Sequence, residues 1–120
     1  LDSVVADRLS GNNIMYTCHF YAGTHTQWLR DKITNALNNG IPIFVSEWGT
    51  SSADGNGGVF TDETNRWLNY MADKKISWCN WSLCDKNETS AALNQGANAS
   101  DGLSNSELSD SGKIVFNSFK

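Results

Sequence analysis

The residues of this chain that could do chemistry stand at the ends of short apolar segments. Glu47 is the clearest case, because it closes an apolar run that is bounded by Pro42 and Gly49. The run is too short for a globular helix, and its β-branched and aromatic residues favour a strand that is apolar on both faces. A carboxylate at the C-terminal end of such a strand is hard to explain as packing. Glu47 is therefore a candidate catalytic group, and the alternative is a surface glutamate where a loop begins.

Two further segments end in a similar way. His19 and Tyr21 close one of them, and Trp81 lies near the end of the other. In a parallel sheet the C-terminal strand ends lie on one side, so these side chains come within reach of Glu47. A carboxylate beside a phenol and an imidazole suits a nucleophile held ionised by hydrogen bonds, and an exposed tryptophan suits a platform for a sugar ring. A single histidine or tryptophan here is more often structural, but their coincidence on one rim favours a site.

The elements that must position these residues alternate strand with helix three times. The patterns predict strands over residues 14–20, 41–48 and 76–83, helices over residues 25–38, 62–73 and 106–118, and a long polar loop over residues 84–105. This order is typical of a parallel α/β arrangement with right-handed crossovers. The helices are expected to cover one sheet face through Trp28, Leu29, Ile33, Trp67, Leu68 and Met71. The other face is left bare, so more chain or another copy must cover it.

Three local features are also predicted. A helix finishes within residues 1–12 with Gly11 as its stop, and Thr61 caps the helix that begins at residue 62. Cys18 and Cys79 lie in predicted strands and are expected to be buried free thiols. Because the chain has three cysteines, a disulfide remains open as an alternative.

Composition narrows the class of protein. The 120 residues are 39% hydrophobic and carry a net charge of -4, which is typical of a mildly acidic globular chain. No cluster of Lys and Arg points to nucleic acid, and no apolar run approaches the ~20 residues of a membrane span. No metal-ligand spacing is present, and the glycine-rich residues 55–58 lack the lysine of a phosphate loop. We therefore expect no cofactor, no metal, no nucleic acid and no membrane partner.

Several motifs resemble glycoside hydrolase family five, and most of all its bacterial-type endoglucanases (cellulases). The motifs are His19-Phe20-Tyr21-Ala22-Gly23-Thr24-His25, Ile43-Phe44-Val45-Ser46-Glu47-Trp48-Gly49-Thr50-Ser51 and Asn80-Trp81-Ser82-Leu83, followed by residues 85–93 as the family's final loop. The resemblance covers nearly the whole chain. It implies a (β/α)8 TIM barrel in which residues 1–120 supply strands six to eight, the C-terminal part of the catalytic domain. It also implies a secreted enzyme, although no signal peptide is visible and Leu1 looks like an internal cut.

The resemblance implies roles for individual residues. Glu47 falls on the catalytic nucleophile, His19 and Tyr21 flank the nucleophile and the sugar beside it, and Trp81 stacks under a glucosyl unit. Tyr21 and Trp81 are expected to bind substrate, and the expected subsites toward the non-reducing end are lined by Ala53, Asp54, Lys86, Asn87 and Glu88. The substrate is expected to be a β-glucan polysaccharide.

One departure from the family pattern is serious. The family's general acid/base is a glutamate in an Asn-Glu motif on strand four, whereas the pair Asn87-Glu88 follows the last strand of this chain. Retaining hydrolysis needs two carboxyl groups about 5–5.5 Å apart, and this chain supplies one of them. We therefore expect part of an endo-β-1,4-glucanase that needs the N-terminal part of the barrel, or another copy. The alternative is a non-catalytic folding or glucan-binding fragment without turnover alone.

Overall fold

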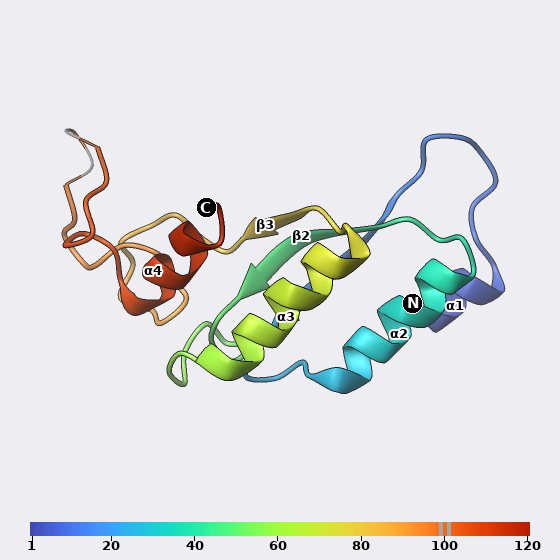
Figure 1. Cartoon of the computed structure of the whole chain (residues 1–120), viewed down its shortest axis with the longest axis horizontal. Coiled ribbons are helices and arrows are strands. Elements are labelled where there is room, and N and C mark those ends of the chain that lie inside the picture. Colours follow the sequence, from blue (N-terminus) through green and yellow to red (C-terminus); the bar gives the residue numbers. More distant parts are fainter. Residues whose placement is uncertain (99, 101) are drawn as a thin grey trace.

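The computed structural model describes residues 1–98, 100 and 102–120. The elements in chain order are α1 Asp2–Ala6, β1 Tyr16–Tyr21, α2 Gln27–Asn38, β2 Ile43–Gly49, α3 Thr61–Lys74, β3 Trp78–Asn80 and α4 Asp110–Asn117 (Figure 1). The strands form one sheet in the order β1-β2-β3, and both pairs of neighbours are parallel. The predicted parallel α/β arrangement is therefore confirmed.

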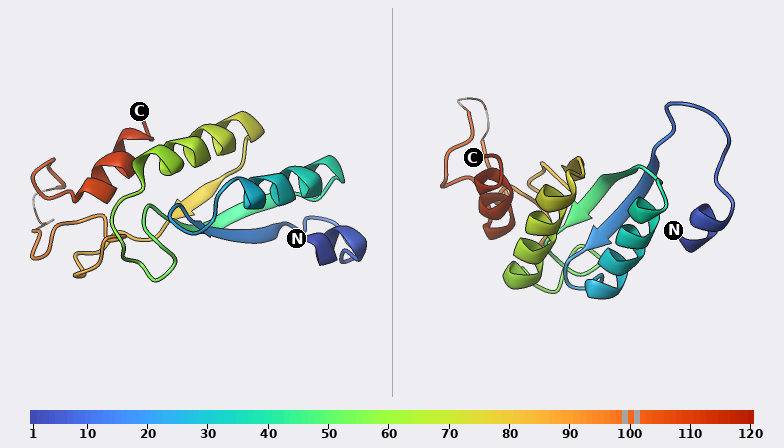
Figure 2. Two further views of the ribbon diagram at one scale, coloured as in Figure 1. Left: turned by 90° about the horizontal axis from the view of Figure 1, so that it is seen from below. Right: turned by 45° about the vertical axis from the view of Figure 1, so that its right-hand side comes forward.

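The core lies between the sheet and the helices that cover one of its faces. Figure 2 shows α2 and α3 on the same side of the sheet, with no helix laid across the opposite side. The ring of Trp67 on α3 stacks on Phe20 of β1 at a centroid distance of 3.9 Å, and Phe20 stacks on Trp48 of β2 at 5.6 Å. The remaining large buried side chains of this core are Ile33, Ile41, Val45 and Met71. Full burial of one such aliphatic side chain contributes about 1.5–3 kcal/mol.

A charged side chain, that of Arg30, is buried in this core. The guanidinium of Arg30 on α2 is 4.8 Å from the ring centroid of Trp67 and donates to Glu63 on α3 at 2.6 Å. It also donates to Gln27 through two nitrogens, each at 3.2 Å. Arg30 is only 4% exposed, so these partners are what makes its burial tolerable. The cluster fixes α2 against α3 on the covered side of the sheet.

The bare face of the sheet carries the alternate residues of the strands. Thr17, His19, Ser46 and Cys79 are all exposed there. Cys79 was expected to be buried, and that expectation is wrong, because it lies next to Trp78 in β3 and points away from the helices. Cys18 is buried as predicted, and all three cysteines are free. Burial raises the pKa of the Cys18 thiol.

Several predicted boundaries are wrong at the ends of elements. Helix α1 ends at Ala6, and Gly11 is a loop residue with a φ of 145°. Helix α3 begins at Thr61 itself, with Phe60 as its N-cap and no side-chain cap. Trp28 is 48% exposed in the first turn of α2, where it packs on His25 and not on the sheet.

The last strand and the last helix are both shorter than predicted. Strand β3 ends at Asn80. The backbone N–H of Trp81 still donates to Trp48 O at 2.8 Å, but Ser82 O then accepts from Cys84 N at 2.9 Å and from Ala92 N at 3.0 Å, so the chain bonds to its own loop and leaves the sheet. Helix α4 starts only at Asp110, where the side chain of Ser109 accepts from Gly112 N at 3.0 Å. The residues before it form an antiparallel bridge between Leu93 and Leu108. Residues 99 and 101 of the predicted polar loop lie outside the described residues.

Candidate active site

An irregularity in β2 delivers Glu47 to the bare face. On β1 the register passes from Thr17 to His19, whereas on β2 it passes from Phe44 to Glu47, so β2 has one extra residue. The pairing of β2 with β3 shows the same extra residue between Val45 and Trp48. A bulge of this kind re-aims the side chains that follow it. Strict alternation would place Ser46 and Glu47 on opposite faces.

Both residues instead contact the same histidine. The Nε2 atom of His19 is 2.9 Å from Ser46 Oγ, and its Nδ1 atom is 3.6 Å from Glu47 Oε2. The other carboxylate oxygen of Glu47, Oε1, accepts a hydrogen bond of 2.6 Å from the Tyr21 hydroxyl. The three residues predicted from the strand ends, His19, Tyr21 and Glu47, are therefore brought together.

Tyr21 is held as a hydrogen-bond donor by its surroundings. Burial, and then the hydrogen bond to the Glu47 carboxylate, raise the pKa of Tyr21 well above its usual range. Its ring lies against Gly49, where an added Cβ would meet ring carbons at 2.5 Å. Its backbone N–H donates to Nδ1 of His25 at 3.0 Å. A neutral phenol fixed in this way keeps one oxygen of Glu47 in place at any pH near neutrality.

Two loops meet beside this centre and carry the predicted subsite residues. Lys86 Nζ donates to Glu88 Oε2 at 2.8 Å, and Ser90 Oγ donates to Glu88 Oε1 at 2.5 Å. The Glu88 side chain lies against Gly55, whose added Cβ would come within 2.6 Å of the carboxyl group. The backbone of the two loops is joined by Ser90 N donating to Gly55 O at 3.0 Å.

The charge state of Glu88 follows from these contacts. The hydrogen bond from Lys86, joined by the one from Ser90, holds the pKa of Glu88 below its usual range, and the same contact raises the pKa of Lys86. Glu88 also acts on the centre, because its charge is one of the causes that raise the pKa of Tyr21. A carboxylate held ionised in this way is poorly suited to be a general acid.

The other predicted subsite residues lie on the rim. Ala53 and Asp54 are exposed in the loop after β2, where Ala53 N donates to Thr24 Oγ1 at 2.9 Å and Asp54 Oδ1 accepts from Asn56 N at 2.9 Å. Trp81 is 49% exposed just beyond β3, and the peptide bond that joins it to Ser82 is cis. Asn87 is exposed between Lys86 and Glu88 and shares a surface hollow with them.

Sequence reasoning missed two hydroxyl residues of the centre. Thr17 Oγ1 and Ser46 Oγ are hydrogen-bonded to each other, and Ser46 also contacts His19. Thr17 was within reach of the sequence, because it stands two residues before His19 and so shares its face. Ser46 was within reach as well, because it follows the buried Val45 and so takes the opposite face by simple alternation.

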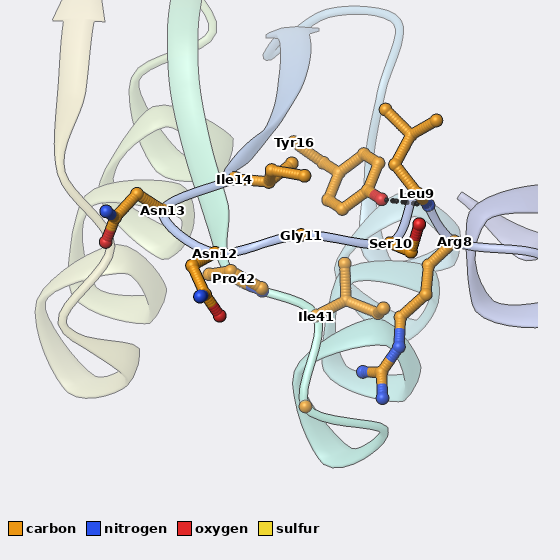
Figure 3. Close-up of a pocket in the computed structure, with 11 residues that line it drawn as sticks. Arg8, Leu9, Ser10, Gly11, Asn12, Asn13, Ile14, Tyr16, Ile41 and Pro42 are labelled. Atoms are coloured by element: carbon orange, nitrogen blue, oxygen red, sulfur yellow. Dashed lines mark hydrogen bonds between the residues drawn. The ribbon is translucent and has the colours of Figure 1, made fainter.

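A hollow of about 590 Å³ lies at the other end of the strands (Figure 3). It is enclosed by the loop before β1 and by the chain around Pro42, and the hydroxyl of Tyr16 there accepts from Leu9 N at 2.8 Å. Its wall has no carboxylate and no histidine, and Arg8 is its one charged residue. The hollow marks the N-terminal ends of the strands, and it is separate from the candidate site.

Two features are absent from the described ranges, a metal-binding cluster and a membrane-spanning helix. No three His, Cys, Asp or Glu side chains gather there in a way that could hold a metal ion. None of the helices described has the length and apolar character needed to cross a membrane.

Comparison with known proteins shows which family the chain resembles. The family model for cellulase (glycosyl hydrolase family 5) matches residues 2–87. An endoglucanase of Clostridium saccharobutylicum is 56% identical over 115 residues, which are 96% of this chain and 26% of that protein. Endoglucanase A of Evansella cellulosilytica is 53% identical over 109 residues, which are 91% of this chain and 22% of that protein. The chain therefore spans about a quarter of the length of these curated relatives.

Solved structures agree with the sequence comparison. The catalytic domain of Thermobifida fusca endoglucanase Cel5A matches with a TM-score of 0.90 and 31% identity, over 99% of this chain and 39% of that one. A variant of that domain has been solved in complex with cellotetraose. The catalytic domain of alkaline cellulase K matches with a TM-score of 0.88 and 34% identity, over 95% of this chain and 39% of that one. Together with the family match over more than half its length, this shows that the chain belongs to glycosyl hydrolase family 5.

Proposed function

We propose that residues 1–120 are the C-terminal three β/α units of a TIM-barrel endo-β-1,4-glucanase that works with retention of configuration. The observation that carries the proposal is the Glu47 carboxylate at the mouth of a parallel strand, with one oxygen held by Tyr21 at 2.6 Å. Similarity to endoglucanases over nearly the whole chain supports the substrate class. Secretion is part of the proposal, because a polymeric glucan does not cross a membrane.

Glu47 acts as the nucleophile in this proposal. Its Oε1 is held by Tyr21, and Oε2 is the oxygen that attacks the anomeric carbon. The bond from that carbon to the leaving oxygen breaks, a proton from the acid/base residue reaches the leaving oxygen, and a glycosyl ester forms on Glu47. Water then attacks the anomeric carbon, gives a proton to the acid/base residue, and the bond from that carbon to Glu47 breaks, which frees the carboxylate.

The acid/base residue lies outside this chain. Glu88 is the nearest alternative in sequence pattern, but both of its oxygens are used by Lys86 and Ser90, and its pKa is lowered. A general acid requires the opposite shift, toward the working pH. Glu88 instead orients the Lys86 ammonium, which together with Trp81 and the rim residues Ala53, Asp54 and Asn87 would bind the glucan.

The rest of the barrel is the expected partner. The bare sheet face and the free edges of β1 and β3 need a cover, because exposed strand edges pair with other chains. A second candidate function, glucan binding without turnover, is favoured for the chain alone by the half-exposed ring of Trp81. We expect the isolated chain to show no more than that binding, since loss of acid–base catalysis alone costs roughly 10²–10⁴-fold in rate.

An exchange chimera tests the function. The matched segment of the Clostridium saccharobutylicum endoglucanase is replaced by this chain, which is 56% identical to it. We expect the chimera to release reducing sugar from carboxymethylcellulose, with the β-anomer as the first product seen by NMR. A folded chimera that does not hydrolyse β-1,4-glucans, or one that first releases the α-anomer, would contradict the proposal. The isolated chain, assayed in parallel, separates turnover from binding.

A further inference from the structure

A row of hydrogen bonds runs along the bare sheet face toward Glu47. It begins at Thr17, whose hydroxyl is bonded to that of Ser46, and continues from Ser46 Oγ to His19 Nε2 at 2.9 Å. The opposite side of the imidazole, Nδ1, lies 3.6 Å from Glu47 Oε2. Two strands contribute, since Thr17 and His19 stand two apart on β1, and Ser46 of β2 follows the buried Val45 and so faces the same side.

With a neutral imidazole, the chemistry of these groups allows one arrangement of protons. An ionised carboxylate only accepts hydrogen bonds, so the nitrogen that faces it, Nδ1, must carry the proton in a neutral imidazole. The Nε2 lone pair then accepts the Ser46 hydroxyl proton, and Ser46 Oγ in turn accepts the proton of Thr17. Every donor in the row is thus aimed toward the nucleophile, as is the hydroxyl of Tyr21 on the other oxygen.

We propose that Thr17 and Ser46 are positioning residues that hold His19 as the Nδ1–H tautomer, with that N–H directed at Glu47. The inference rests on the proposed role of Glu47 as nucleophile. If Nε2 carried the proton, a lone pair on Nδ1 would face the carboxylate and push it from the place where Tyr21 holds it. Within the described ranges Glu47 is the one carboxylate within 4.0 Å of the His19 ring nitrogens, and the neutral phenol of Tyr21 is the other titratable group that contacts this carboxylate.

Histidine ¹⁵N chemical shifts read the tautomer without any assay of activity. In the exchange chimera labelled at histidine, the His19 signals are those that vanish in His19→Gln. We expect a protonated Nδ1 and an unprotonated Nε2 at neutral pH. Ser46→Ala should give a mixture of tautomers, and Ser46→Thr, which restores a hydroxyl, should return the original pattern. Thr17→Val keeps the shape without the hydroxyl and should move the shifts in the same direction by less.

Kinetics provide the second readout. We expect Ser46→Ala to lower kcat about fivefold, the factor that one ordinary hydrogen bond is worth, with KM little changed. Ser77→Ala, an exposed serine beside β3, is the matched control and should leave kcat unchanged. A wild-type spectrum with the proton on Nε2, or a Ser46→Ala variant with unaltered tautomer and kcat, would overturn the inference. An inactive but folded unmutated chimera would overturn the proposed function instead, while the shifts would still decide the role of Ser46.

Discussion

The two faces of this small sheet are built on different principles. The face under α2 and α3 is filled by apolar rings, with Phe20 held between Trp48 and Trp67 and all three fully buried. The other face carries Phe44 and a row of polar side chains that ends at Glu47 and Tyr21. Alternation along β1 is enough to give it both kinds of face. Strand β2 needs a bulge as well, because its carboxylate must leave the packed face just before Trp48 returns to it.

On strand β2, the residues that pack in the core and the carboxylate that could do chemistry are therefore no more than two positions apart. Substitutions on the covered face should therefore change stability, and substitutions on the bare face should change turnover or binding. Variants of the exchange chimera can break or sharpen this distinction, and they are ordered here by expected effect.

The largest effect is expected for Glu47→Gln. A carboxamide lacks the charge needed to attack the anomeric carbon, so turnover should fall by roughly 10⁴–10⁶-fold, the range seen when a nucleophile is removed. Its shape is kept, so glucan affinity and melting temperature should stay near those of the parent. Asp73→Asn, at an exposed position of α3, is the matched control. Near-normal activity of Glu47→Gln would show that Glu47 is not the nucleophile.

On the covered face, Trp67→Ala should cost about 3–5 kcal/mol in the free energy of unfolding. The ring is fully buried, stacks on Phe20 at 3.9 Å and donates through Nε1 to His25 O at 2.8 Å. Denaturant titration measures the loss. If the variant lost turnover while its unfolding free energy was unchanged, the division of labour between the two faces would be wrong.

Glu63→Gln tests the buried charge on the same face, with an expected loss of about 1.5–3 kcal/mol at neutral pH. Burial acts to raise the pKa of Glu63, but the hydrogen bonds from Arg30 and Arg66 outweigh it and lower that pKa. Because the folded pKa lies below the unfolded one, the stability from Glu63 is present above the unfolded pKa and is lost as pH falls through the folded value. Unfolding free energies of parent and variant should therefore converge in acid. A difference that grows as the pH falls would contradict the sign of this shift.

The smallest of these effects is expected for Trp81→Ala on the rim. Its half-exposed ring adds little to stability, but as a sugar platform it should contribute roughly 1–3 kcal/mol to glucan binding. Calorimetry with cellotetraose, carried out in the Glu47→Gln background so that the ligand is not hydrolysed, measures the loss of affinity. Trp28→Ala is the matched control, because Trp28 is an equally exposed tryptophan on α2. Equal affinities for parent and Trp81→Ala would mean that the platform lies elsewhere.

Sequence patterns were enough to predict the elements that bury apolar surface. The parallel order, the helices carrying Ile33 and Met71, and the strand that carries Glu47 all follow from spacing. The patterns failed where a local contact decides the outcome. Strand β3 stops early because Ser82 O bonds Cys84 N and Ala92 N of the following loop, and α4 starts late because Ser109 caps it.

In the candidate site, too, some features could be predicted from the sequence and others depend on local contacts. His19, Tyr21 and Glu47 could be grouped from sequence, because parallel strand ends must meet on one side. The turn of Glu47 onto the face of His19 depends on a bulge, and the close approach of Glu88 to Gly55 depends on how two loops meet. Neither is encoded in residue spacing, so only the folded chain reveals them.

The most direct test of the account is to trap the glycosyl ester. An activated cellobioside that carries fluorine in place of the hydroxyl beside the anomeric carbon forms this ester quickly and releases it slowly. When this compound is incubated with the active chimera, the intact mass of the protein should rise by one fluorinated cellobiosyl group. Peptide mapping should place that group on Glu47. A label on another carboxylate, or an active chimera that never acquires a label, would contradict Glu47 as the nucleophile.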